Sequence, residues 1–190
     1  MSDFETEIEH CLAVLEQGGT ILYPTDTVWG IGCDATNPAA VQKIYDIKDR
    51  PEKKSMIVLL ADEKDLLKYV ANPEPQVFSF LKTVSKPTTI IYDGAIGLAD
   101  NLVHPNGSIG IRIVQDKFCR HLLKRFRKPL VSTSANLSGD PTPKRFSEIL
   151  NHIITNVDYV VNYRQDDDSE AQASAVVKLN RDGTPNYIRE

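Results

Sequence analysis

The sequence predicts an α/β fold, a single domain over residues 1–190 with a twisted mixed sheet covered by helices. Apolar strand-like runs alternate with amphipathic helical segments through most of the length, which is the pattern of helices packed on a sheet. Hydrophobic residues make up 41% and charged residues 25% of the 190, an ordinary globular composition that can bury one core. No internal repeat divides the chain, so we expect no second domain.

The first half of the chain gives clear boundaries. Apolar residues at helical spacing predict a helix over 3–17, which Gly18 and Gly19 end. Asn37 as N-cap and Pro38 in the first turn predict a second helix, which ends before Pro51. The other expected elements are strands over 20–24, 55–61 and 87–92, a helix over 62–71 capped by Asp62, and a helix over 75–84.

The second half continues the alternation after a loop rich in glycine and asparagine over 93–107. Thr142 as N-cap and Pro143 in the first turn predict a helix over 141–153. The remaining expected elements are strands over 108–113, 129–134, 158–162 and 174–179, and a basic helix over 115–127.

Charge and composition exclude several classes. A net charge of −4 argues against a surface built to coat nucleic acid, and no apolar run is long enough to span a membrane. The acidic N-terminus is unlike a signal peptide, so we expect a cytoplasmic protein without a membrane partner. Three cysteines without CxxC spacing and four scattered histidines predict neither disulfides nor a protein-bound metal cage.

The end of the second helix gathers cations. Lys48 continues the apolar stripe of Val41, Ile44 and Tyr45, so a cation lies on the buried face. One interpretation is a lysine whose methylenes cover the core while its ammonium reaches water. Arg50 has a simple alternative too, since cations at a helix C-terminus complement the macrodipole. With Lys53 and Lys54 nearby, the proline-terminated turn could also direct several cations at one anion.

Two polar segments follow strands. Residues 131–143, VSTSANLSGDPTP, offer hydroxyls, an amide and backbone N–H groups at the end of a strand, where α/β proteins bind ligands. The simpler interpretation is a strand-to-helix turn with local caps. Residues 21–32, ILYPTDTVWGIG, also change from a buried strand to turn chemistry. Trp29 there suits either a cavity wall or the core.

The chain lacks the familiar catalytic motifs. It contains no GxxxxGK[ST], no GxGxxG after a strand and no GxSxG. Asp26, Asp34 and Asp140 could help to place hydrated Mg²⁺, although isolated aspartates in turns mostly cap backbone.

Three segments together resemble the YrdC-type threonylcarbamoyl-AMP synthases. GGTILYPTDTVWGIG is similar to that family's signature, KDRPEKKSMIVLL to its K-x-R-P turn and following strand, and STSANLSGDPTP to its S-x-N loop. The strands SIGIRI and SAVVKL follow in the family's order, so the likeness covers nearly the whole chain. It implies the YrdC-like fold, a twisted α/β sheet with a concave, positively charged cavity, in the short form without an added domain.

The resemblance also implies an activity and site residues. The family joins L-threonine, bicarbonate and ATP into threonylcarbamoyl-AMP, releasing pyrophosphate, for t6A at position 37 of tRNA. It places Lys48 and Arg50 on the ATP phosphates as the catalytic pair. By position, the other nucleotide residues are Ser108, Ser134, Asn136, Thr142 and Arg189, and the threonine residues are Thr25, Arg112, Ser132 and Ser174.

The resemblance also implies a metal ion and partners for this chain. Mg²⁺ would arrive with ATP and the product would pass to a tRNA threonylcarbamoyl transferase complex. Whether tRNA or double-stranded RNA also contacts the chain directly is left open by the sequence. Leu59 and the stretch Val84-Ser85-Lys86 depart from the family pattern near the threonine pocket. The alternatives are a non-catalytic module that binds structured RNA and a carbamoyl-transfer protein of the same fold.

Overall fold

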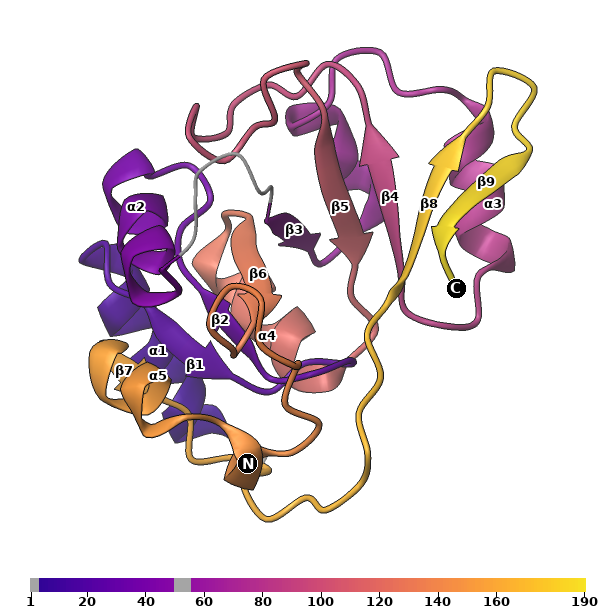
Figure 1. Cartoon of the computed structure of the whole chain (residues 1–190). Helices are drawn as coiled ribbons and strands as arrows, with labels where there is room; N and C mark the ends of the chain where they lie inside the picture. The colour runs from indigo at the N-terminus through magenta and orange to yellow at the C-terminus, as the bar shows by residue number, and fades with distance from the viewer. Residues whose placement is uncertain (1–3, 50–55) are drawn as a thin grey trace.

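The computed structural model describes residues 4–49 and 56–190 and confirms the predicted α/β class. Nine strands form one mixed sheet in the order β7-β1-β2-β6-β3-β5-β4-β8-β9 (Figure 1). The strands are β1 Ile21–Tyr23, β2 Gly30–Gly32, β3 Ile57–Leu60, β4 Thr88–Tyr92, β5 Ile109–Ile113, β6 Leu130–Ser134, β7 Tyr159–Val160, β8 Ala175–Leu179 and β9 Pro185–Arg189. The helices are α1 Glu5–Glu16, α2 Pro38–Ile47, α3 Gln76–Thr83, α4 Lys117–Phe126 and α5 Asn151–Asn156, with 3₁₀ turns η1 Glu63–Lys68 and η2 Phe146–Glu148.

The strand order brings distant parts of the sequence together. Strand β6 lies between β2 and β3 and pairs antiparallel with both. Strand β3 is parallel to β5, whereas β4 is antiparallel to β5 and parallel to β8. Side chains at one end of these strands therefore come from segments that are more than 100 residues apart.

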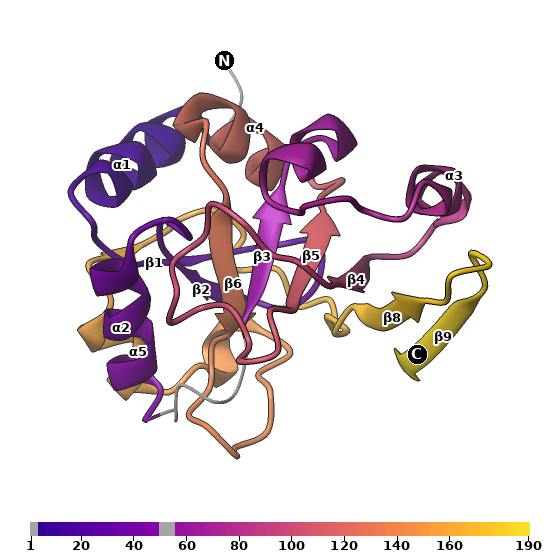
Figure 2. The ribbon, with the colours of Figure 1, turned by 90° about the horizontal axis from the view of Figure 1, so that it is seen from above.

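Helices α1 and α4 cover one side of the central strands. Figure 2 shows them together beyond β6, β3 and β5, with long loops on the opposite side. The inward face of α4 buries Phe118, Leu122 and Phe126, because apolar residues recur at helical spacing. Asp116 caps this helix by accepting a hydrogen bond from Cys119 N at 2.9 Å.

The start of α2 agrees with the sequence signals. Asn37 Oδ1 accepts hydrogen bonds from Ala39 N at 3.0 Å and Ala40 N at 3.2 Å, and Pro38 occupies the first turn. The predicted Asn37 cap is therefore confirmed. The helix ends at Ile47, so Lys48 is its C-cap residue.

The helix predicted over 141–153 is wrong. Thr142 caps no helix: the first turn is the 3₁₀ segment Phe146–Glu148, and α5 starts only at Asn151. The segment is instead fixed by distant contacts, because Lys144 O accepts from Ala171 N at 3.3 Å and Arg145 Nε donates to Asp168 O at 2.8 Å. Tertiary contacts override the local capping pattern here.

Three further elements differ from the sequence pattern. The helix expected over 62–71 is the 3₁₀ turn η1, although Asp62 does cap it through Lys64 N at 3.1 Å. Strand β2 contains two glycines in three residues, a composition that disfavours a strand, and pairing with β1 and β6 overrides this preference. Strand β9, which pairs with β8, was also missed.

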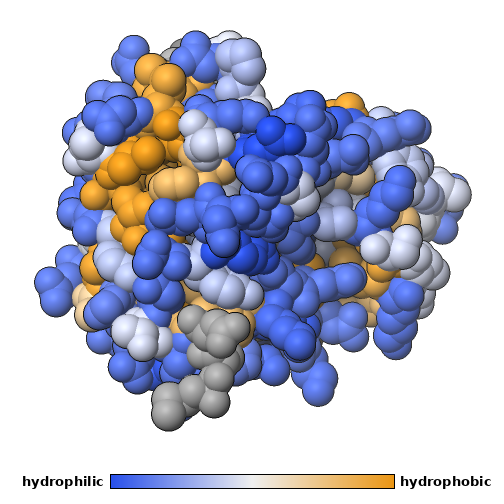
Figure 3. Space-filling model, turned by 90° about the horizontal axis from the view of Figure 1, so that it is seen from below, coloured by the Kyte–Doolittle hydropathy of each residue, from blue (hydrophilic) through white to orange (hydrophobic). Residues whose placement is uncertain are grey.

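The surface is mostly hydrophilic. Figure 3 shows the molecule from below the view of Figure 1, where hydrophobic surface gathers in one region at the upper left. Leu150, which precedes α5, is 45% exposed. Within residues 4–49 and 56–190, no helix is both long and apolar enough to cross a membrane.

Candidate functional site

Six residues singled out from the sequence line one cavity of about 230 Å³. They are Arg112 on β5, Ser132 and Ser134 on β6, Thr142 in the following loop, Ser174 just before β8, and Arg189 on β9. Its described lining contains two arginines and four hydroxyl groups of this set and no carboxylate. The sheet therefore assembles a cationic, hydrogen-bonding hollow.

Strand register explains the convergence. Ser132 on β6 is opposite Ile57 on β3, which is opposite Gly110 on β5. Paired residues share a face of the sheet, and Arg112 lies two residues along from Gly110 on the same face. A Cβ on Gly110 would lie 3.1 Å from Thr89 Cγ2. A side chain at position 110 would therefore crowd this face of the sheet, and glycine leaves the space beside Arg112 open. The floor of the cavity is thus set by the pairing of β6, β3 and β5.

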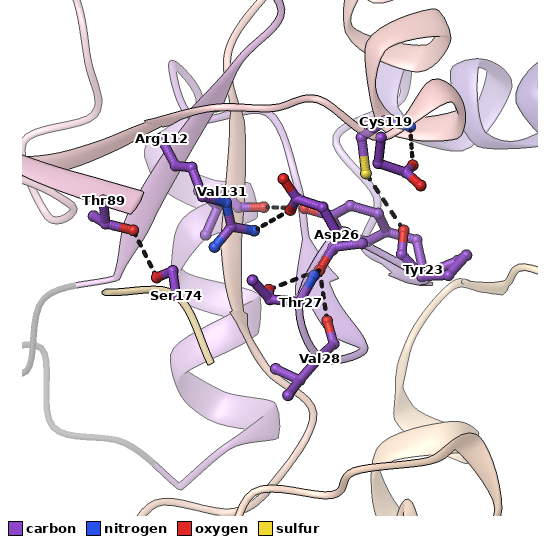
Figure 4. A network of polar contacts seen from close by, with 12 residues as sticks. Tyr23, Asp26, Thr27, Val28, Thr89, Arg112, Cys119, Val131 and Ser174 are labelled. Carbon is purple, nitrogen blue, oxygen red and sulfur yellow. Dashed lines mark hydrogen bonds and ion pairs between the residues drawn. The ribbon is translucent and has the colours of Figure 1, made fainter. Parts of the chain in front are cut away.

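Arg112 is held by a buried ion pair. Its Nη2 lies 3.1 Å from Asp26 Oδ1, and the two side chains are 3% and 11% exposed (Figure 4). Among the described residues, Arg112 Nε and Nη2 and both carboxylate oxygens of Asp26 have no hydrogen-bond partner. A buried charge needs a counter-ion, so Asp26 is the residue that keeps a charged Arg112 beside the cavity. The sequence suggested Mg²⁺ placement for Asp26 and missed this pairing.

Ser174 is fixed from two sides. Its hydroxyl is 2.9 Å from Thr89 Oγ1, and its carbonyl oxygen accepts hydrogen bonds from Arg189 Nε at 3.0 Å and Nη2 at 2.8 Å. Arg189, although exposed, is therefore docked on the segment before β8. Its guanidinium retains Nη1 for another partner.

Thr25 does not present its hydroxyl to this cavity, contrary to the expected role. Its Oγ1 donates to Val28 O at 2.7 Å and accepts from Thr27 N at 3.0 Å, so the group braces its own turn. Thr25 is 2% exposed and lines a neighbouring cavity of about 550 Å³. Thr27, which the sequence analysis did not select, lines both cavities.

Lys48 is buried against the S-x-N loop. Only 1% exposed, it donates hydrogen bonds from Nζ to the backbone carbonyl oxygens of Ser134 and Asn136. Its own carbonyl oxygen accepts from Ser138 N at 2.9 Å. The interpretation in which the ammonium reaches water is wrong, and the ammonium supports the loop in place of facing open solvent.

Asn136 organises the same loop from within. Its Nδ2 donates to Asp140 O at 2.7 Å and Leu137 O at 3.1 Å, while its Oδ1 accepts from Ser134 Oγ at 2.5 Å. The amide is therefore committed to the loop, whereas Ser134 Oγ lies in the cavity wall with lone pairs to spare. Asn136 shapes the loop that presents Ser134.

One predicted site residue lies apart from this group, and another cannot be placed among the described residues. Ser108 is not in the cavity wall; its N–H donates to Asn106 Oδ1 at 3.0 Å in the turn before β5. Arg50 lies outside the described residues.

The larger cavity is not positively charged overall. Its walls contain Lys86, Lys144 and Arg164, but also four acidic residues: Asp26, Asp167, Glu170 and Glu190. Trp29 lines this cavity, is 7% exposed and packs on Phe146 with ring centroids 4.8 Å apart. Trp29 therefore forms part of the cavity wall and also packs in the core, so both interpretations made from the sequence apply. The positive character expected for the concavity belongs to the smaller hollow.

Burial makes the nearby thiol and phenol poor acids. Desolvation raises the pKa of the Tyr23 hydroxyl and of the Cys119 thiol well above their usual values. Tyr23 Oη donates to Val131 O at 3.1 Å, and Cys119 Sγ is 3.4 Å from Pro24 O. Both groups serve the packing behind the site.

Acidic residues do not cluster as metal ligands in the described parts of the chain. No group of three histidine, cysteine, aspartate or glutamate side chains there is arranged to hold a metal ion. Asp34 accepts from Thr36 N at 2.8 Å and pairs with Lys128 at 2.6 Å, as a turn-capping aspartate does.

The family model of Sua5, YciO and YrdC proteins, described as telomere recombination, matches residues 13–190. The chain belongs to this family. Among its curated relatives, a threonylcarbamoyl-AMP synthase of Vibrio parahaemolyticus is 38% identical over 137 residues, 70% of this chain and 74% of the relative. A threonylcarbamoyl-AMP synthase of Pseudoalteromonas translucida is 34% identical over 165 residues, 85% of this chain and 88% of the relative.

Solved structures of the Sua5/YciO/YrdC family share the fold. Sua5 of P. abyssi in complex with L-threonine gives a TM-score of 0.82 at 20% identity and covers 92% of this chain. This chain spans 51% of that protein. YciO of E. coli gives a TM-score of 0.80 at 23% identity, covering 97% of this chain and 89% of its own. The YrdC-like fold inferred from the sequence is confirmed.

Proposed function

We propose that this chain is a threonylcarbamoyl-AMP synthase. It would join L-threonine, bicarbonate and ATP into threonylcarbamoyl-AMP and pyrophosphate, for the t6A modification of tRNA. The observation that supports this most is the convergence of Arg112, Ser132, Ser134, Ser174 and Arg189 on one hollow. The names of the curated relatives support the same activity.

Arg112, Ser132 and Ser174 suit the amino acid. A guanidinium whose Nε and Nη2 are buried can direct Nη1 at a carboxylate, and the serine hydroxyls can accept from or donate to the threonine side chain. Leu59 is opposite Arg112 in the register of β3 and β5 and is fully buried, so its side chain lies beside Arg112 on the same face of the sheet. Its departure from the family pattern therefore alters the packing beside Arg112, while Leu59 itself is not part of the cavity wall.

Ser134, Thr142 and Arg189 suit the nucleotide. Ser134 is presented by the loop that Lys48 and Asn136 hold, so Lys48 acts through the loop in the described conformation. Arg50, which follows two residues after Lys48, would supply a cation to the phosphates. Ser108 stays a more distant nucleotide residue in this proposal.

The reaction needs alignment more than a covalent nucleophile. The neutral amine of threonine attacks the carbon of carbon dioxide, opens one C=O π bond and loses a proton to give a carbamate. When the carbon comes from bicarbonate, the C–OH bond breaks and the hydroxyl leaves with the amine proton as water. A carbamate oxygen then attacks the α-phosphorus of ATP, the α–β phosphoanhydride bond breaks, and pyrophosphate leaves. Because the nucleophile is already anionic, fixed cations that neutralise phosphate charge and hold the two substrates in line are sufficient.

Mg²⁺ would be held by the triphosphate. The described lining of the smaller cavity contains arginine, hydroxyl and apolar groups, and carboxylates are absent from it. Such a lining fits the oxygens of a metal-bound triphosphate better than the metal itself. The ion would neutralise charge on the phosphates during transfer.

In the cell, the product and the tRNA substrate would involve further partners. The product would pass to a tRNA threonylcarbamoyl transferase complex in the cytoplasm. Contact with tRNA or double-stranded RNA would use basic side chains close to the cavity, such as Lys86 and Lys144 in the wall of the neighbouring cavity.

The test is a substrate-omission assay with the purified chain. MgATP, bicarbonate and L-threonine are combined, pyrophosphate is followed, and the adenylate is identified by mass. We expect release that requires threonine and bicarbonate, and Arg112→Met should reduce it at least about tenfold. Arg125→Met, which removes an exposed arginine paired with Glu5, is the matched control and should leave the rate unchanged.

Other outcomes would change the assignment. Pyrophosphate release that ignores threonine would overturn the synthase proposal. RNA binding without turnover would favour the non-catalytic module, and dependence on a carbamoyl donor in place of bicarbonate would favour the carbamoyl-transfer protein.

A further inference from the structure

The turn between β1 and β2 is fixed at three successive places. Pro24 O is contacted by Cys119 Sγ at 3.4 Å, Thr25 O accepts from Arg164 Nη2 at 2.7 Å, and Val28 O accepts from Thr25 Oγ1 at 2.7 Å. The Arg164 contact is the one charged hydrogen bond of these three, and such bonds are the stronger kind.

Arg164 joins this turn to helix α4. Its Nη1 donates to Asp116 Oδ2 at 2.7 Å, while Asp116 Oδ1 caps α4 through Cys119 N. The planar guanidinium thus spans two partners in fixed directions, which a lysine ammonium cannot reproduce. Arg164 also has a φ of 63°, a left-handed conformation that a non-glycine residue adopts at a cost.

Asp26 is carried by the turn that Arg164 holds. Both of its carboxylate oxygens are buried, and within the described residues neither has a hydrogen-bond partner. In the described part of the chain, its ion-pair partner is Arg112. Because no side-chain hydrogen bond from the described residues orients this carboxylate, its position follows from the backbone of the turn.

Arg112 depends on Asp26 in the same way. Nε and Nη2 are buried without hydrogen-bond partners, and Asp26 is its ion-pair partner in the described structure. Figure 4 shows the guanidinium directed at Asp26, next to Thr27 and Ser174. Nη1 is left as the nitrogen that can face the cavity. A shift of Asp26 would rotate the guanidinium and move Nη1.

We propose that Arg164 is a positioning residue for the site, acting through the turn at residues 25–28 and Asp26 to orient Arg112. The identity of the molecule that Arg112 then binds, an amino-acid carboxylate, rests on the proposed function. The inference that Arg164 orients Arg112 does not depend on the proposed function.

Three variants test this chain of contacts. Arg164→Met removes both hydrogen bonds and keeps much of the side-chain bulk. Arg164→Lys keeps the charge but can reach only one of the two partners at a time. Arg125→Met removes a comparable arginine–carboxylate pair on α4, away from the turn.

The first measurement needs no substrate. The Nε–H resonance of Arg112, assigned through Arg112→Lys, is recorded by NMR in each protein. We expect it to shift, and its exchange with water to accelerate, in Arg164→Met, partly in Arg164→Lys, and not in Arg125→Met. An unchanged Arg112 resonance in folded Arg164→Met would overturn the inference whatever the activity.

The second measurement separates positioning from stability. Arg164→Met should raise the KM for L-threonine about tenfold or more with a change in the KM for ATP below about threefold, and Arg164→Lys should recover part of the loss. A purely structural role would lower the melting temperature and the active fraction while leaving both KM values alone. An inactive wild-type chain would count against the proposed function, whereas the NMR result would still decide the role of Arg164.

Discussion

Lys48 Nζ lies 2.5 Å from the backbone carbonyl oxygen of Asn136, and this contact joins the C-terminal end of α2 to the loop after β6. A second hydrogen bond to Ser134 O gives the buried ammonium two backbone acceptors in one loop. The lysine that the sequence assigned to substrate phosphates is, in this structure, also what holds the loop in place.

Replacing Lys48 should therefore loosen the loop. Lys48→Met keeps the length of the side chain but leaves two carbonyl oxygens without their charged donor, which should lower the free energy of unfolding by about 2–4 kcal/mol. Urea unfolding measures this. Lys43→Met on the same helix is the control, because Lys43 is 48% exposed and should cost less than about 1 kcal/mol. Equal losses for the two variants would show that the buried contacts contribute little.

Asp26 should be needed mainly because Arg112 is buried. Asp26→Leu leaves an uncompensated guanidinium and should destabilise the fold by about 3–5 kcal/mol. The double variant Asp26→Leu with Arg112→Met removes both charges and should be more stable than Asp26→Leu alone. A double-mutant cycle by urea unfolding gives the coupling. Additive losses would contradict a direct dependence between the two side chains.

Two glycines of β2 should respond differently to the same change. A Cβ on Gly32 would lie 2.6 Å from Val131 O and 2.7 Å from Tyr23 Cε1, so Gly32→Ala should cost about 1–3 kcal/mol. A Cβ on Gly30 would lie 3.2 Å from Ser132 Oγ, at the cavity wall. Gly30→Ala should stay within about 1 kcal/mol of wild type yet raise the KM for L-threonine. The reverse order of stabilities would refute this account of β2.

Stability should fall in alkaline solution. Burial, with a smaller contribution from Glu7, raises the pKa of the Cys11 thiol to about 12 from a usual value of 9.0. The unfolded chain therefore loses this proton first, so the contribution is complete below pH 9 and is lost as the pH rises from 9 to 12. Urea unfolding under reducing conditions at several pH values measures the slope, which one such group changes by at most about 1.4 kcal/mol per pH unit. Cys11→Ala should flatten it; an unaltered slope would show that other groups dominate.

The sequence predicted the elements whose signals are local. Asn37 followed by Pro38 marked the start of α2, and the register of apolar residues placed Lys48 on its buried face. The hydroxyl-rich end of β6 likewise pointed to the cavity. These features depend on neighbours within a few residues, which a sequence pattern contains.

The features that were missed depend on distant partners. Thr142 looks like a helix cap, but contacts between Lys144 and Ala171 fix its segment as a loop. The ion pair of Asp26 with Arg112 joins segments 86 residues apart, and no spacing in the sequence reveals it. Thr25 is a different case, because its hydroxyl donates to Val28 O within its own turn, and residue spacing alone does not show whether a hydroxyl is used locally or faces a ligand.

The position of β9 has a consequence for protein synthesis. The cavity receives Arg189 only after this strand has paired with β8, while its other polar walls come from residues made much earlier. A nascent chain that has emerged as far as β8 would hold Ser174 without the arginine that docks on its carbonyl oxygen. Ligand affinity should therefore be gained only once β9 has been synthesised and has paired with β8, and the hollow stays open to solvent until then.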